Sequence, residues 1–185
     1  MAAIGAFLLD IIQTIVLALS IFVISYLFLF QPHQVKGSSM APNFHTDEFL
    51  LTDKLSYRFN EPKHGDVIVF KAPPSEACAQ SECEYIKRII GVPEDKIRLT
   101  AGFIYVNDKK LTEPYLDPSV VTNPEGFFNE NQTLTLKENE YFVCGDNRPA
   151  SRDGRAFGPI KRDSIIGKAW LRYWPFSKIG FVSSE

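Results

Sequence analysis

The chain divides into one long apolar run and a remainder in which short apolar stretches alternate with turn residues. Residues 11–30 read IIQTIVLALSIFVISYLFLF and contain no charged side chain. A helix of this length covers about 30 Å, the thickness of the hydrocarbon core of a bilayer. The run lacks the polar stripe that a helix at the surface of a soluble core presents. The pattern therefore predicts one membrane-spanning helix.

A cleaved signal peptide is the alternative interpretation of this run. The segment before it lacks the usual positive charge, and the run exceeds the about 7–15 apolar residues typical of a signal peptide. It is followed by Gln-Pro-His-Gln instead of a cleavage site with small residues. We expect a retained anchor over residues 1–31. The positive-inside rule does not orient it, because neither flank carries many cations.

Beyond Pro32 the apolar runs are short, rich in Val, Ile, Phe and Tyr, and separated by turn residues, which is typical of strands. Asn107 and Asp108 predict a tight hairpin turn. Residues 112–132 are polar and contain three prolines, which predicts a long surface excursion. The predicted strands are residues 48–52, 66–71, 85–90, 96–100, 103–106, 133–136, 141–144 and 165–173.

Charge and length argue against a nucleic-acid-binding protein and against a large multi-domain enzyme. The chain of 185 residues has 20 Lys and Arg against 22 Asp and Glu, so nothing indicates a nucleic-acid-binding surface. All of the cations lie beyond residue 30. The part beyond the apolar run suffices for one domain with its own core, and leaves no room for a nucleotide-binding fold with a partner domain.

The histidines and cysteines bear on three kinds of site: a metal site, a catalytic triad and a disulfide. The histidines show no metal-ligand spacing, so we expect no metal. A Ser-His-Asp triad that uses His45 or His64 remains an alternative, since triad members need only meet in space. Cys78 and Cys83 bracket a short loop and are either a disulfide or two free thiols. Cys144 ends an apolar strand and is expected to be a small core residue.

Four segments stand out: residues 35–42 (VKGSSMAP), 64–70 (HGDVIVF), 85–93 (YIKRIIGVP) and 145–155 (GDNRPASRDGR). Each alone has an ordinary explanation, such as a serine in a turn or a strand lysine that faces solvent. In this order behind a membrane helix, they resemble the type I signal peptidases, the membrane-bound serine proteases that remove signal peptides from exported proteins. The resemblance leaves only residues 112–132 unmatched.

The resemblance implies a Ser-Lys dyad. The serine immediately before Met-x-Pro is Ser39, which corresponds to the nucleophile, and Lys87 corresponds to the general base. A serine hydroxyl is a weak nucleophile until an adjacent base takes its proton. A lysine in water is almost always charged, but burial among apolar residues lowers its pKa and frees the amine to act as that base. Arg88 would add like-charge repulsion if it lay close.

The resemblance also implies a supporting set. Ser151 is expected to hydrogen-bond the Lys87 amine, and the expected ion pairs are Asp153 with Arg155 and Asp146 with Arg88. Asn147 and Arg148 match the family motif, but we assign them no role from the sequence.

The sequence departs from the family pattern at two positions near the nucleophile. Gly37 stands where some members have a serine that donates to the oxyanion, so the hole would rest on the Ser39 backbone N–H and a second donor that the sequence does not identify. Asn43 stands where threonine is usual.

Signal peptides carry small residues at positions −1 and −3, so shallow apolar pockets are expected. An extended substrate peptide would pair with the backbone at residues 84–86. The aromatic residues Tyr173, Trp174 and Phe176 suit either the membrane interface or packing against the domain. The residues that match family pocket positions are Val35, Met40, Phe44, Tyr85 and Ile86, all of which also suit a core.

The sequence thus predicts a mainly β fold: a single N-terminal transmembrane helix followed by an all-β, partly barrel-like catalytic domain with a smaller β excursion. The expected division is an anchor at 1–31 and an extracytoplasmic peptidase domain at 32–185, with the excursion at about 101–140. We expect a signal peptidase of a bacterial plasma membrane, acting on preproteins in contact with lipid, without cofactor or metal. The alternatives are a non-catalytic anchored β domain that binds a secretion component and a related Ser-Lys protease with another substrate.

Overall fold

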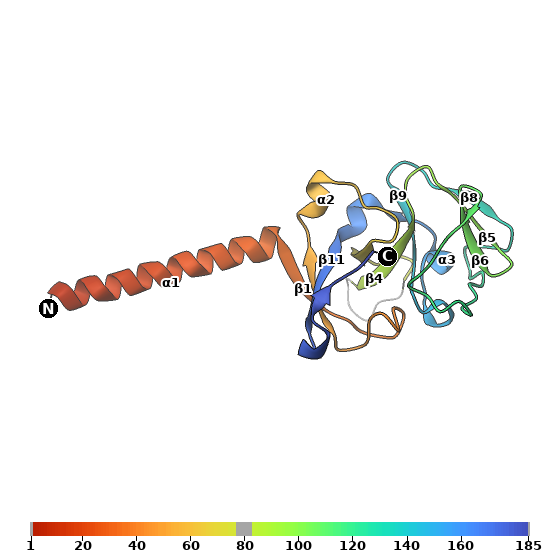
Figure 1. The fold of residues 1–185 in the computed structure, drawn as a ribbon. Coiled ribbons are helices and arrows are strands. Elements are labelled where there is room, and N and C mark those ends of the chain that lie inside the picture. The colour runs from red at the N-terminus through yellow and green to blue at the C-terminus, as the bar shows by residue number, and fades with distance from the viewer. Residues whose placement is uncertain (1, 77–82, 185) are drawn as a thin grey trace.

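The computed structural model describes residues 2–76 and 83–184. One long helix, α1 (Ala2–Phe28), projects from a β domain (Figure 1). Its segment Ile4–Tyr26 is long and apolar enough to cross a membrane, and none of it is buried against the domain. Phe30, the last residue of the predicted run, already belongs to a strand and stacks on Trp170 at 5.1 Å between ring centroids. Pro32 cannot continue a helix, which explains the early end.

The larger sheet has the strand order β1-β2-β11-β3-β4-β9-β10, with β12 paired to β11. All of its pairings are antiparallel. The sheet curls, because β11 and β4 each shift register along their length. Its strands are β1 (Phe30–Gln34), β2 (Phe49–Asp53), β3 (Val67–Lys71), β4 (Glu84–Gly91), β9 (Glu140–Cys144), β10 (Ile160–Lys161), β11 (Ile165–Trp174) and β12 (Gly180–Phe181).

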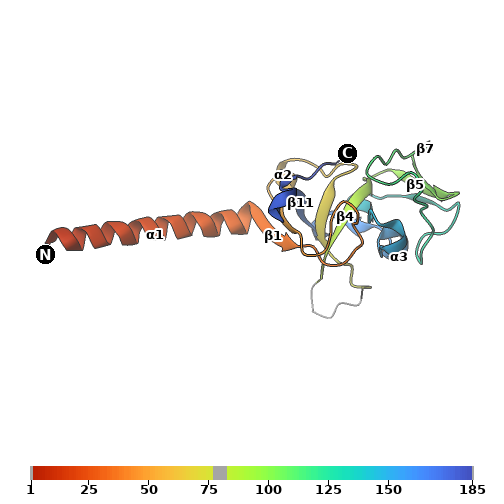
Figure 2. The ribbon, with the colours of Figure 1, turned by 60° about the horizontal axis from the view of Figure 1, so that its bottom comes forward.

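A second, four-stranded sheet has the order β7-β6-β5-β8 and lies at the end of the domain away from α1 (Figures 1 and 2). Asn107 and Asp108 join β6 to β7 with φ of 51° and 63°, which confirms the predicted hairpin turn. Its strands are β5 (Lys96–Thr100), β6 (Phe103–Val106), β7 (Lys109–Lys110) and β8 (Thr133–Thr135).

Strand alternation builds separate cores on the two faces of the larger sheet. Ile68 and Phe70 of β3 enter one apolar cluster with Ile89, whereas Val67 enters another with Met40. A third cluster lies between the two sheets. Strand β3 therefore reads as a continuous apolar run, because both of its faces are covered.

The predicted mainly β fold with an N-terminal apolar helix is confirmed. Each predicted strand is present, with ends that differ by at most one residue. The sequence analysis missed the short strands β7, β10 and β12, and β1, which contains a proline at the sheet edge. It also missed the short helices α2 (Ser56–Phe59) and α3 (Gly154–Phe157).

Residues 112–132 are not only a surface excursion. Thr122 and Phe128 are buried, and Phe128 packs on Phe142 of β9 in the cluster between the sheets. The prediction of a surface excursion did not include these two inward-facing side chains, because the few apolar residues among the prolines do not reveal which of them turn inward.

Candidate active site

Ser39 lies in a tight turn that follows β1. The turn is closed by a hydrogen bond from the Ala41 N–H to the Ser38 carbonyl at 3.1 Å. Val35 and Met40, on either side of Ser39, are buried in one apolar cluster and fix the turn to the sheet. Ser39 itself remains half-buried, so its hydroxyl stays within reach of a ligand.

Lys87 lies in β4, on the face that carries Tyr85 and Ile89 into the core. The side chain is buried, and the residue is only 4% exposed. Its Nζ donates to Ser39 Oγ at 2.7 Å and to the Ile86 carbonyl at 3.0 Å. The two residues singled out by the sequence are therefore in direct contact.

Burial lowers the pKa of Lys87 from 10.5 to about 8. Loss of solvation of the ammonium is the largest cause, and the nearby carboxylates of Asp153 and Asp146 partly oppose it. The repulsion expected from Arg88 does not contribute, because neighbouring strand residues face opposite ways and Arg88 is paired with Asp146. A substantial fraction of the amine is neutral near pH 8.

The Asp153 carboxylate organises the loop that follows β9. It accepts hydrogen bonds from Ser151 Oγ at 2.8 Å, from the Gly145 N–H at 2.9 Å and from the Arg155 guanidinium at 2.8 and 2.9 Å. The predicted pair of Asp153 and Arg155 is thus present and fully buried. The predicted hydrogen bond between Ser151 and Lys87 is not among the contacts of the described residues. The Ser151 hydroxyl donates to Asp153 instead, and Lys87 donates to Ser39 and to the Ile86 carbonyl.

The predicted pair of Arg88 and Asp146 is also present, in two-pronged form at 2.9 and 2.8 Å. Asn43 donates to the same Asp146 carboxylate at 2.8 Å and to the Tyr115 carbonyl at 2.9 Å. The Tyr115 ring covers the Arg88 guanidinium at 3.9 Å. Asn43 therefore replaces the usual threonine with a side chain that joins the nucleophile segment to two others.

Arg148 has a structural function that the sequence analysis missed. Its guanidinium is buried and donates to the Gly145 carbonyl at 3.0 Å, to Thr122 Oγ1 at 2.7 Å and to the Glu113 carboxylate. Arg155 donates to the carbonyls of Arg148 and Ser151 at 2.8 and 3.1 Å. Residues 145–155 are therefore held by side chains from residues 112–132, a link that no sequence motif signals.

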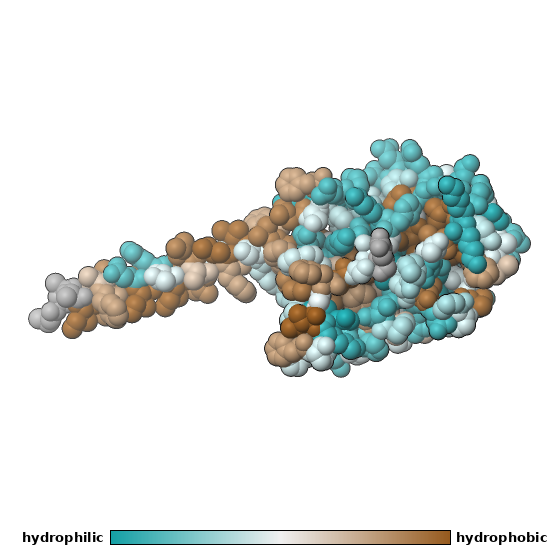
Figure 3. All heavy atoms as spheres, viewed as in Figure 1, coloured by the Kyte–Doolittle hydropathy of each residue, from teal (hydrophilic) through white to brown (hydrophobic). Residues whose placement is uncertain are grey.

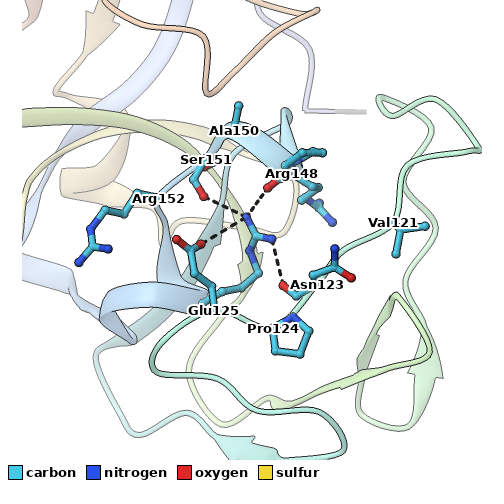
Figure 4. A pocket seen from close by; sticks show the side chains of 10 residues that line it. Val121, Asn123, Pro124, Glu125, Arg148, Ala150, Ser151 and Arg152 are labelled. Carbon is cyan, nitrogen blue, oxygen red and sulfur yellow. Dashed lines mark hydrogen bonds and ion pairs between the residues drawn. The ribbon is translucent and has the colours of Figure 1, made fainter.

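A polar cavity of about 390 Å³ lies behind this loop (Figure 4). The Arg155 guanidinium donates to the carbonyls of Ser151, Arg148 and Asn123 and lies 3.9 Å from the Glu125 carboxylate. These contacts occupy the Arg155 guanidinium, so the arginine joins residues 148–151 to residues 123–125.

The predicted pocket residues divide into two groups. Val35, Met40 and Phe44 are buried in one apolar cluster, as plain core residues are. Tyr85 and Ile86 are only partly buried and border the Lys87 amine.

Among the described residues, part of one edge of β4 beside the dyad has no strand partner. Residues 84–88 pair with β3 on one side, whereas β9 joins the other side only from Arg88 onward. The register with β3 points the Ile86 carbonyl toward the open side, where it accepts from Lys87. His33 of β1 lies across this gap, 3.0 Å from the Glu84 carboxylate.

The histidine-based alternative is not formed. His45 contacts Glu48 and Lys178, and His64 lies 2.6 Å from Asp95. Among the described contacts of the Ser39 hydroxyl, the basic partner is Lys87. Cys78 lies outside the described residues, so the structure does not decide between the two alternatives for Cys78 and Cys83, a disulfide and two free thiols.

A serine hydroxyl on a buried, partly neutral amine is the arrangement of a serine hydrolase with a lysine base. The family model described as signal peptidase, peptidase S26, matches residues 8–174. Signal peptidase I of Bacillus caldolyticus is 38% identical over 162 residues, which cover 84% of this chain and 85% of the relative. Signal peptidase IB of Staphylococcus aureus strain MRSA252 is 34% identical over 185 residues, covering 94% and 93%.

A solved signal peptidase I from Enterococcus faecalis V583 is 28% identical, with a TM-score of 0.46, covering 59% of this chain and 97% of that one. On the family model and the sequence relatives, the chain belongs to the signal peptidase family, peptidase S26. The resemblance noted from the four sequence segments is confirmed.

Proposed function

We propose that this chain is a membrane-anchored serine endopeptidase that removes N-terminal signal peptides from exported preproteins, with Ser39 as nucleophile and Lys87 as general base. The observation that carries the proposal is the contact of 2.7 Å between Lys87 Nζ and Ser39 Oγ, made by an amine whose pKa burial lowers to about 8. A non-catalytic binding domain would gain nothing from burying a lysine against a serine.

The neutral Lys87 amine takes the proton of the Ser39 hydroxyl as Oγ attacks the carbonyl carbon of the scissile bond. The carbonyl oxygen becomes an oxyanion. When the tetrahedral intermediate collapses, the C–N bond breaks and the Lys87 ammonium gives its proton to the leaving amine. A water molecule, deprotonated by the same amine, then attacks the acyl ester, which frees the signal peptide and regenerates Ser39.

The substrate peptide binds in extended form along the open edge of β4 at residues 84–86 and adds a strand to the sheet. This edge leads to Lys87, so a peptide paired there brings its backbone against the dyad. Tyr85 and Ile86, which remain partly exposed, contact the small side chain at position −1.

Helix α1 holds the enzyme in the bilayer. Signal peptides cross the same membrane, so an anchored peptidase meets its substrate at the lipid surface. The domain lies on the extracytoplasmic face of a bacterial plasma membrane, where the cleavage site emerges.

The direct test uses the full chain in detergent with a preprotein. We expect Ser39→Ala and Lys87→Ala each to abolish cleavage, while Ser119→Ala and Lys137→Ala, which change the same residue types at exposed positions, cleave like the wild type. Cleavage by Lys87→Ala at the wild-type rate would reject the dyad.

The pH profile tests the charge of the base. Only the neutral amine is competent, so kcat/KM should rise about tenfold per pH unit below the pKa of Lys87, which is about 8, and level off above it. A steady-state series from pH 5.5 to 10 measures this, and a flat profile through that window would exclude a lysine base.

A further inference from the structure

The loop after β9 holds the nucleophile turn by two hydrogen bonds from one residue. The Asn147 backbone N–H donates to the Ser39 carbonyl at 3.0 Å, and the Asn147 side-chain amide donates to the Ser38 carbonyl at 3.0 Å. Both carbonyls that flank the Ser39 N–H are therefore held from the catalytic loop, although Asn147 touches neither Ser39 Oγ nor Lys87 among the described contacts.

The bond to Ser38 has a directional consequence. The peptide unit between Ser38 and Ser39 is planar and trans, so its C=O and N–H point in opposite directions. The Ser38 carbonyl accepts from Asn147 Nδ2 and from the Ala41 N–H at 3.1 Å, which occupies both lone pairs. Fixing the carbonyl on one side fixes the Ser39 N–H on the other.

The Ser39 N–H is available to a ligand. Within the residues that the structure describes, no group accepts a hydrogen bond from it. Backbone N–H groups that are held without an internal acceptor are suited to receive a developing oxyanion. Gly37 has no side chain to share this task, so the orientation of a single N–H matters more here.

We propose that Asn147 is a positioning residue for the oxyanion hole: through the Ser38 carbonyl it aims and polarises the Ser39 N–H. Hydrogen bonding at a carbonyl strengthens the N–H of the same peptide unit as a donor, because the unit polarises as a whole. The inference rests on the proposed function, since it needs Ser39 to be the nucleophile. It adds an assignment for a motif residue that had none.

The test separates binding of the transition state from binding of the ground state, using Asn147→Ala in the full chain in detergent. Loss of a direct oxyanion donor costs about 10²–10³ in kcat, and we expect loss of its orienting bond to cost about 10- to 50-fold, with KM within about twofold. The backbone N–H of residue 147 still holds Ser39, so the turn survives. Asn129→Ala, an exposed asparagine outside the site, is the control.

A peptide aldehyde provides the second readout. Ser39 Oγ adds to the aldehyde carbon, the proton passes to Lys87, and the carbonyl oxygen becomes the oxyanion of a hemiacetal. The inhibition constant of the aldehyde should rise by the same factor as kcat falls, whereas that of the matching peptide alcohol, which forms no oxyanion, should stay constant. Equal weakening of both ligands, or unchanged kcat, would overturn the proposal.

The pH profile distinguishes aiming of the N–H from disturbance of the dyad. Asn147→Ala should keep the wild-type midpoint of kcat/KM, because Lys87 is not a partner of Asn147. Asn147→Asp should lower kcat at least as far, since a carboxylate cannot donate to the Ser38 carbonyl. An Asn147→Ala midpoint shifted by a full pH unit would contradict the assignment.

If Ser39→Ala cleaves the preprotein, the proposed function fails. If Ser39→Ala is inactive but Asn147→Ala is fully active, only the inference about Asn147 fails.

Discussion

At the scale of single residues, the site depends on side chains whose environment is set by backbone atoms. Burial lowers the pKa of Lys87, which suits the amine to the proposed role of base, and the Ile86 carbonyl and the Ser39 hydroxyl both accept from it, which fixes its direction. Position 145 requires a glycine, because the turn that carries Ser39 and the loop after β9 approach its Cα too closely for a side chain.

Gly145→Ala should inactivate the enzyme. An added Cβ would lie 2.4 Å from the Ser39 carbonyl oxygen and 2.2 Å from Ser151 Oγ, so the nucleophile turn must move. A displacement of about 1 Å costs about 100-fold in rate, which we expect in kcat/KM for a preprotein. Gly180→Ala, where no atom lies within 4 Å of the new methyl group, should cleave normally. Full activity of Gly145→Ala would show that the turn is not constrained there.

Lys87→Met should make the folded protein more stable at neutral pH while abolishing activity. The pKa of Lys87 falls from 10.5 to about 8 on folding, so below pH 8 the folded state carries a buried ammonium at a cost of about 3 kcal/mol. Between pH 8 and 10.5 the unfolded chain binds more protons, so wild-type stability rises with pH. The difference in the free energy of unfolding between the variant and the wild type, measured in urea, should therefore shrink across this range. A difference that does not change with pH would show that the buried ammonium is not its source.

At the scale of elements, the excursion at residues 112–132 supports the loop at residues 145–155 of the candidate site. Glu113 and Thr122 hold Arg148, and Tyr115 covers Arg88 and binds Asn43. The prolines and polar residues that suggested an exposed loop instead let the chain extend across the domain and place these groups. The segment is therefore part of the active-site scaffold.

Glu113→Ala should destabilise the protein strongly. The variant leaves the Arg148 guanidinium buried without its carboxylate, and breaking one partner of a buried pair costs about 3–5 kcal/mol. Urea unfolding measures the loss, and Glu138→Ala, at an exposed position, is the control. Adding Arg148→Met to Glu113→Ala should recover part of the stability, since no unpaired charge remains. A loss below about 1 kcal/mol, as for a surface pair, would contradict this reading.

The strands and the dyad were predictable because their signals are local. Alternation and β-branched residues located β3, β4 and β11, and the motifs around Ser39 and Lys87 singled out two residues that the structure brings into contact. The contacts of Arg148, Asn43 and Asn147 were not predictable, since each joins segments far apart in the chain. The bond from Ser151 to Asp153 depends on hydroxyl orientation, which no spacing determines.

At the scale of the whole molecule, apolar surface gathers where the domain meets α1 (Figures 1 and 3). The end of β11, the following turn and β12 expose large apolar side chains on this side, with Arg172 and Lys178 nearby. Such a surface suits the boundary between headgroups and acyl chains. The exposed residues are Trp174, Phe176, Ile179 and Phe181.

Trp174 should report this contact in reconstituted vesicles. Lipids brominated near the headgroup should quench the fluorescence of the full chain, and most of the quenching should vanish in Trp174→Phe, which leaves Trp170 as the remaining tryptophan. Trp170 is packed between Phe30 and Phe181, so it is shielded. Equal quenching of the two proteins would place Trp174 in water.

The half-open edge of β4 has a consequence for the timing of catalysis. In the proposed complex, a preprotein paired with this edge supplies the backbone that this stretch of sheet lacks, and it covers the small part of Lys87 that solvent still reaches. Further dehydration favours the uncharged form. The pKa of Lys87 should thus be lower in the enzyme–substrate complex than in the free enzyme. Binding of the preprotein would then increase the fraction of neutral lysine that is available for its own cleavage.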